Sequence, residues 1–182
     1  MININQMLQQ TKKIRYPAVQ KKTESGIDLI ATEYLNTREF FKEGSKGEGG
    51  IFRWVNTDIF KFLPTEIHNS PAIQLVAKEL VSGREKSKDE ENFYYESRKE
   101  HVFEKTDMAH LKQVCELNFI GSNNFLSRKG FNIFWMRNPA GELYKVYINF
   151  WEGEMEVDIC RYGQIKGCGP NRRAFFDSNV LR

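Results

Sequence analysis

Residues 131–162 constrain the fold more than any other stretch, because their pattern predicts strands, turns and a pairing register together. β-Branched and aromatic residues alternate with polar ones, which is typical of strands in a half-buried sheet. Asn138-Pro139-Ala140-Gly141 suits a type I turn, and Glu152-Gly153 is short enough for a two-residue hairpin loop. The sequence therefore predicts an antiparallel, three-stranded meander.

Pairing across these two turns predicts which residues share a face of the meander. Val146 should lie opposite Phe134 on one neighbouring strand and opposite Ile159 on the other. One face then carries nine apolar or aromatic residues: Phe134, Met136, Tyr144, Val146, Ile148, Phe150, Met155, Val157 and Ile159. A shift of one residue would scatter this set over both faces, so the pattern favours this register. We expect helices to cover this face.

The opposite face of the meander is amphipathic, and we expect it to be solvated. It carries Trp135, Lys145, Tyr147, Asn149, Trp151, Glu154, Glu156, Asp158 and Cys160. It is either the polar side of an antiparallel sheet or a binding face with three stacking surfaces and carboxylates beside them. The stacking residues would be Trp135, Trp151 and Tyr147. Its three carboxylates would repel phosphate, which counts against a nucleic-acid platform on this face.

The rest of the chain is predicted to be mainly helical. Apolar residues at helical spacing predict helices over 26–43, 70–83 and 106–118 and a short helical turn over 56–63, whereas 51–55 resembles a short edge strand. The predicted fold class is α+β. An antiparallel three-stranded C-terminal meander, with allowance for one or two extra edge strands, would be covered on one face by three to four helices.

The length and composition fit one globular domain with basic ends. Of the 182 residues, 40% are hydrophobic and 13% aromatic, which is sufficient for a single core. We divide the chain into a basic N-terminal arm (1–22), one α+β domain (23–162) and a basic Gly/Arg/Phe-rich tail (163–182) that packs on the domain or extends from it. Because there is no membrane-spanning apolar run, no apolar leader and no disulfide pattern, we expect a cytoplasmic protein.

The positive charges concentrate at the two ends of the chain. The net charge is only +3, yet residues 1–22 contain five basic residues and no acid, and residues 161–182 contain five basic residues and one acid. The ends either fold back onto the acidic middle of the chain or bind an anionic partner. The partner-binding candidates are Lys12, Lys13, Arg15, Arg172 and Arg173, together with the sheet aromatics Trp135 and Tyr147.

No motif in the sequence specifies a reaction. The glycine-rich stretch 44–50 lacks the spacing of a phosphate-binding loop, and neither the cysteines nor the histidines have metal-ligand spacing, so neither a cofactor nor a metal site is expected. Cys168 lies between two glycines and close to Arg172 and Arg173, which makes it a candidate reactive thiol.

Two classes of function remain open. The first is a non-catalytic interaction protein that binds an anionic macromolecule, either a nucleic acid or an acidic protein surface, through its basic ends. The second is a metal-dependent hydrolase or nuclease in which Glu154, Glu156 and Asp158 bind a hard cation on the exposed face of the meander. The sequence favours the first class, because no catalytic constellation is recognisable in it.

Overall fold

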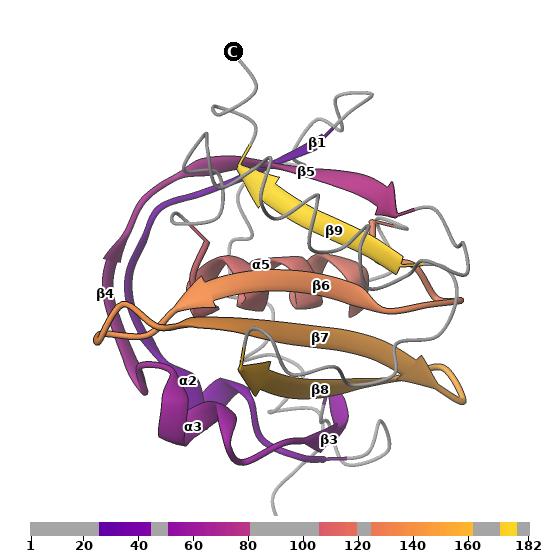
Figure 1. The fold of residues 1–182 in the computed structure, drawn as a ribbon, viewed down its shortest axis with the longest axis horizontal. Coiled ribbons are helices and arrows are strands. Elements are labelled where there is room, and N and C mark those ends of the chain that lie inside the picture. Colours follow the sequence, from indigo (N-terminus) through magenta and orange to yellow (C-terminus); the bar gives the residue numbers. More distant parts are fainter. Residues whose placement is uncertain (1–25, 45–50, 81–105, 120–124, 162–171, 178–182) are drawn as a thin grey trace, which may run out of the picture.

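The structure is a computed structural model of the chain, and it describes residues 26–44, 51–80, 106–119, 125–161 and 172–177. Seven strands form one sheet in the order β1-β5-β9-β6-β7-β8-β3, and β2 pairs with β4 in a second sheet. In Figure 1, β1 and β5 lie at one edge of the large sheet, β2 and β4 curve along its side, and α5 lies behind β6. The elements are β1 (Gly26–Leu29), β2 (Thr32–Asn36), α2 (Thr37–Phe40), β3 (Phe52–Val55), α3 (Ile59–Phe62), β4 (Glu66–Ser70), β5 (Ile73–Leu80), α5 (Met108–Phe119), β6 (Asn132–Arg137), β7 (Leu143–Trp151), β8 (Glu154–Arg161) and β9 (Arg172–Asp177).

The predicted meander and its register are confirmed. β6 pairs antiparallel with β7, and β7 with β8, so that Val146 lies opposite both Phe134 and Ile159. All nine residues of the predicted apolar face belong to the hydrophobic core or pack against it. Buried α5 residues, including Leu111 and Val114, belong to the same core. The alternation of side chains along the three strands was therefore sufficient to identify the inner face.

The two turns of the meander have the expected geometry. The backbone N–H of Gly141 donates to the carbonyl oxygen of Asn138 at 2.9 Å, which closes the first turn. In the second turn, Glu152 and Gly153 have φ angles of 52° and 86°. Two consecutive positive φ angles are typical of a type I′ turn, whose twist matches that of the flanking strands.

The predicted fold class is wrong, because the meander is only part of a larger sheet and helices contribute little to its cover. The described residues contain three helices, and α2 and α3 are each four residues long. Among these three helices of the described residues, only α5, with 12 residues, is long enough to pack along the sheet. The large sheet is mixed, because β3 runs parallel to β8 and β9 runs parallel to β6.

Two segments that were predicted to be helices contain strands. The stretch 26–43 forms β1, β2 and the short α2, and the stretch 70–83 contains β5. In β1, Ile27 and Leu29 are buried while Asp28 between them is exposed, which is the two-residue period of a strand. Antiparallel pairing between β1 and β5 therefore outweighed the helical spacing of apolar residues in both segments.

Three further predictions are confirmed. The helix expected over 106–118 is α5, and the short strand expected at 51–55 is β3, which ends one side of the large sheet. The helical turn expected within 56–63 is α3.

Strand β9 joins the two halves of the large sheet. It lies between β5, to which it is antiparallel, and β6, to which it is parallel. The ring of Phe175 is fully buried and stacks on that of Phe134, with centroids 4.5 Å apart and planes 4° apart. Part of the predicted C-terminal tail is thus an inner strand of the sheet, whereas 163–171 and 178–182 lie outside the described residues.

Candidate functional site

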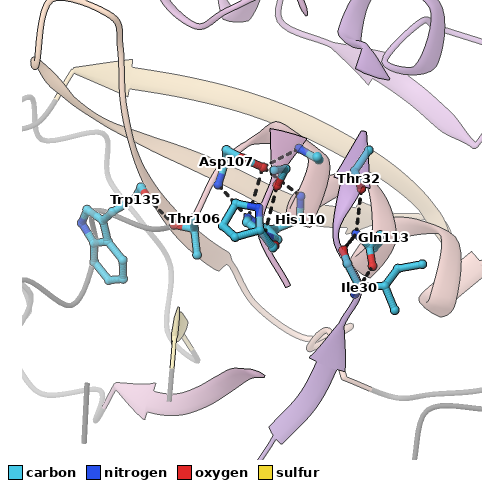
Figure 2. A network of polar contacts seen from close by, with 10 residues as sticks. Ile30, Thr32, Thr106, Asp107, His110, Gln113 and Trp135 are labelled. Atoms are coloured by element: carbon cyan, nitrogen blue, oxygen red, sulfur yellow. Dashed lines mark hydrogen bonds and ion pairs between the residues drawn. The ribbon is translucent and has the colours of Figure 1, made fainter. Parts of the chain in front are cut away.

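A Ser–His–Asp cluster lies at the start of α5 (Figure 2). Ser70 Oγ is 3.2 Å from His110 Nε2, and Asp107 Oδ1 is 3.1 Å from His110 Nδ1. These are the contacts of a nucleophile, a base and an orienting acid in a hydrolase triad. The sequence does not reveal the cluster, because Ser70 and His110 are 40 residues apart and only the fold brings them together.

The hydrogen bonds of His110 show that the cluster cannot work as a triad in this arrangement. Its Nε2 lies 2.8 Å from the carbonyl oxygen of Pro71. Nε2 must carry a proton there, because an unprotonated nitrogen would place one acceptor against another. A nitrogen that already holds this proton cannot remove the proton of Ser70, whether the ring is neutral or charged. The base position of the triad is therefore occupied.

Burial of the same residues supports a structural role. The side chains of Ser70 and His110 are almost completely inaccessible to solvent, with exposed fractions of 3% and 0%. Asp107 caps α5, because its Oδ1 accepts from the backbone N–H groups of Ala109, at 2.9 Å, and His110, at 3.2 Å. Burial raises the pKa of Asp107. The hydrogen bonds and charge interaction with His110 lower this pKa by a larger amount, so it lies below its ordinary value. The cluster thus fastens the end of β4 to the start of α5.

A second polar contact fixes α5 to the arch of strands beside it (Figure 2). Gln113 Oε1 accepts from the backbone N–H of Ile30 at 2.9 Å, and its Nε2 donates to the Ile30 carbonyl oxygen at 2.8 Å. The same Nε2 lies 3.2 Å from Thr32 Oγ1. The side-chain amide therefore replaces backbone pairing where the chain bends between β1 and β2.

The predicted exposure of Trp135 and Tyr147 is wrong. Their exposed fractions are 0% and 2%, and the nearby Lys145 and Cys160 are also buried. Tyr147 Oη lies 3.3 Å from Cys160 Sγ, and Lys145 Nζ lies 5.8 Å from the centre of the Tyr147 ring. β6 and β7 are inner strands of the sheet, and both of their faces are buried. In this structure Trp135 and Tyr147 therefore provide no stacking surface for a partner.

The carboxylates of β8 are engaged by neighbouring donors. Glu156 Oε2 accepts from Asn149 Nδ2 at 3.1 Å, and its Oε1 is 3.9 Å from Arg53 Nε. Asp158 Oδ1 accepts from Asn56 Nδ2 at 2.6 Å. Among the described residues, no group of three or more His, Cys, Asp or Glu side chains is arranged to hold a metal ion. These contacts give no support to a cation site on this strand.

An exposed aromatic and cationic surface lies at the β3 edge of the sheet. Trp54 and Trp151 are exposed by 41% and 56%. The guanidinium carbon of Arg53 lies 5.8 Å from the Trp151 ring centre, and Arg53 Nη1 is 3.2 Å from Glu152 Oε2. Exposed indoles beside a guanidinium are a common basis for contacts with a partner.

Of the basic residues that were predicted to bind a partner, Arg172 and Arg173 lie within the described residues. Arg173 is partly buried, and its Nη1 donates to the carbonyl oxygen of Phe125, so this cation is used within the fold. The backbone of Arg172 lies in β9, opposite Leu80 of β5. The other basic candidates lie outside the described residues: Lys12, Lys13 and Arg15. The candidate thiol Cys168 also lies outside them.

Comparisons with known proteins do not assign this chain to a family. No protein-family model matches it, and no curated protein or solved structure is significantly similar to it. In the described parts of the chain, no helix is both long and apolar enough to cross a bilayer.

Proposed function

We propose that this protein is a non-catalytic interaction protein that binds an anionic macromolecule, a nucleic acid or an acidic protein surface, through its basic ends. The observation that carries the proposal is the separation of charge along the chain. Residues 1–22 hold five cations and no acid, while 23–160 has an excess of acids. Clustered cations attract polyanions and release the counterions condensed on them.

Three features of the described residues support binding rather than catalysis. The Ser–His–Asp cluster is committed to holding α5 in place, because His110 Nε2 is bonded to the Pro71 carbonyl oxygen. The β8 carboxylates Glu156 and Asp158 are bonded to side-chain amides. The exposed Trp54 and Trp151 add a surface of the kind that interaction proteins use.

The test is a salt titration of binding by the full chain, measured by fluorescence anisotropy. Labelled duplex DNA, single-stranded RNA and polyglutamate serve as probes. A variant with Lys12, Lys13 and Arg15 all changed to Gln is compared with a control in which the exposed Arg38, Lys42 and Lys61 are changed to Gln. Both variants lose three charges, so the comparison tests whether the position of the lost charges matters.

We expect binding of at least one probe to weaken steeply with salt, with a log–log slope of about −0.7 to −0.9 for each phosphate contacted if the probe is a nucleic acid. The N-terminal variant should bind more weakly and with a shallower slope, and the control should bind like the wild type. Absence of binding to all three probes, or equal losses in both variants, would refute the proposal.

A further inference from the structure

We propose that the outer face of the large sheet, at its β3 edge, binds an arginine-containing basic segment of a partner protein. The outer face is the side opposite the hydrophobic core, and β3, β8 and β7 are the last three strands at this edge (Figure 1). The indole surface consists of Trp54 on β3 and Trp151 on β7, with Glu156 of β8 between them. The inference is independent of the proposed function, because none of these residues belongs to the basic ends.

The strand register places both indoles on the outer face. Trp151 lies opposite Glu154 and Trp54 lies opposite Glu156, whereas Met155 between these two acids belongs to the core. Partners on neighbouring strands share a face of the sheet. Because neighbouring strands are about 4.8 Å apart, the two tryptophan backbones lie at least about 10 Å apart. A chain segment with several side chains can contact both indoles at this spacing.

A β-bulge in β3 turns two consecutive side chains outward. The register with β8 shifts between Phe52 and Trp54. Phe52 and Val55 are buried, whereas Arg53 and Trp54 between them are exposed. A regular strand would direct one of these two side chains toward the core. The bulge therefore holds a cation and an indole side by side on the outer face.

The charges around the indoles favour a cationic occupant. In the described strands β3 and β8 and the turn before β8, one guanidinium and four carboxylates lie on or beside the outer face: Arg53, Glu152, Glu154, Glu156 and Asp158. Two of these carboxylates also accept from the side-chain amides of Asn149 and Asn56, which are neutral and leave the carboxylate charge in place. This balance repels a phosphate backbone and is complementary to a basic segment.

Arg53 shows how this surface holds a guanidinium. Its Cζ lies 5.8 Å from the Trp151 ring centre, its Nη1 is 3.2 Å from Glu152 Oε2, and its Nε is 3.9 Å from Glu156 Oε1. An arginine of the partner would meet the same combination at Trp54, an exposed indole opposite a glutamate. Arginine suits this better than lysine, since a planar guanidinium stacks on an indole and can also donate two N–H groups to one carboxylate.

The partner binds the face of the sheet and does not add a strand to its edge. The backbone N–H of Gly44 donates to the Phe52 carbonyl oxygen at 2.9 Å, and the Val55 N–H donates to Glu43 Oε1 at 3.3 Å. Strand addition uses the backbone groups of an open edge. Because Glu43 and Gly44 already occupy two such groups of β3, binding on the outer face leaves more of the existing structure in place.

The experiment is a fluorescence-anisotropy titration of labelled peptides with the full chain. In three peptides of about eight residues, serine alternates with arginine, lysine or glutamine. We expect the arginine peptide to bind most tightly and the glutamine peptide least. Trp54→Ala and Trp151→Ala should each weaken binding of the arginine peptide about two- to fivefold, the factor that an exposed cation–π contact is worth. Tyr34→Ala is the control and should bind like the wild type, because Tyr34 is an exposed aromatic residue of the small sheet.

A second pair of variants tests the charge. Glu156→Gln removes a carboxylate between the indoles and keeps a side chain of the same shape. Glu33→Gln removes an exposed carboxylate of β2 and is the matched control. We expect Glu156→Gln to weaken binding of the arginine peptide about threefold, as is typical of exposed ion pairs, and Glu33→Gln to leave it unchanged.

Several outcomes would overturn the inference. One is the absence of arginine-peptide binding at protein concentrations up to about 1 mM, which would detect a dissociation constant in that range. Another is an equal loss of binding in the two tryptophan variants and Tyr34→Ala. Binding of single-stranded RNA or of a neutral oligosaccharide that both tryptophan variants weaken, without peptide binding, would assign the surface to a different ligand class. A dimer in sedimentation velocity that both variants dissociate would assign it to a second copy of this chain.

Discussion

The two ends of α5 differ in whether their buried polar side chains have hydrogen-bond partners. At the start of the helix, His110 is fully buried, and both of its ring nitrogens have partners. At the far end, Asn118 is almost as deeply buried, yet its Oδ1 has none. A buried polar group with partners fixes one arrangement of the chain, whereas one without partners costs stability. The contrast therefore assigns a stabilising role to the polar cluster at the first end and a destabilising buried acceptor to the second.

Replacing His110 tests the architectural end and should have the largest effect. We expect His110→Ala to lower the free energy of unfolding by about 3 kcal/mol, because it leaves a cavity and deprives the Pro71 carbonyl oxygen of its donor. Urea denaturation measures the change. His68→Ala is the control, since this histidine is exposed on β4 and its loss should cost little. Equal losses in the two variants would contradict the assignment.

Replacing Gln113 tests the second anchor of α5. Gln113→Ala removes both hydrogen bonds to the backbone of Ile30. Because this site is partly accessible to water, the expected loss is smaller, about 1–2 kcal/mol. Hydrogen exchange should show faster opening at Ile30 and Thr32 before the rest of the sheet is affected. Unchanged exchange at Ile30 would show that the bend between β1 and β2 does not depend on this amide.

Replacing Asn118 tests the opposite end and should change stability in the opposite direction. We expect Asn118→Leu to raise the free energy of unfolding by about 1 kcal/mol, since an unpaired buried acceptor is removed and apolar surface is added. Thermal and urea unfolding both report it. A clear loss of stability would show that the Asn118 amide is used within the fold, and the contrast between the two helix ends would fail.

The pH dependence of stability provides the smallest and most specific test. The pKa of Asp107 is lowered in the folded chain, so its ionised form stabilises the fold at pH values above the unfolded pKa. This contribution should disappear as the pH falls through the folded pKa. Asp107→Asn keeps a capping oxygen but does not ionise. The difference in urea midpoint between wild type and Asp107→Asn should therefore shrink between pH 7 and about pH 3. A constant difference would contradict the role of the charge.

The sequence was informative where the structure is determined locally. The turn signals at Asn138-Pro139-Ala140-Gly141 and Glu152-Gly153 join strands that are neighbours in sequence, so alternation alone predicted their register. The pairing of β1 with β5 joins residues far apart in the chain, and local apolar spacing did not reveal it. The burial of Trp135 and Tyr147 also depends on their position on inner strands of a sheet whose full extent the sequence does not show.

The polar residues of α5 also differ in whether the sequence alone could identify their environment. The partnership of Ser70 with His110 depends on the position of β4 relative to α5 and has no signature in the sequence. Asn118 does have one, because it follows Val114 by four residues and Cys115 by three, which places it on the buried side of a helix. The sequence was therefore sufficient to predict that this amide is buried.

The central position of β9 has a consequence for how the protein is made. Every other described strand precedes β9 in the chain. Two parts of the sheet therefore emerge from the ribosome before the strand that connects them: the β1–β5 pair, and the group of β6, β7, β8 and β3. Until then β5 and β6 each present an open edge, and open edges can pair with other nascent chains. Chaperone demand and losses to aggregation should therefore depend strongly on the six residues of β9, which follow all the other described strands.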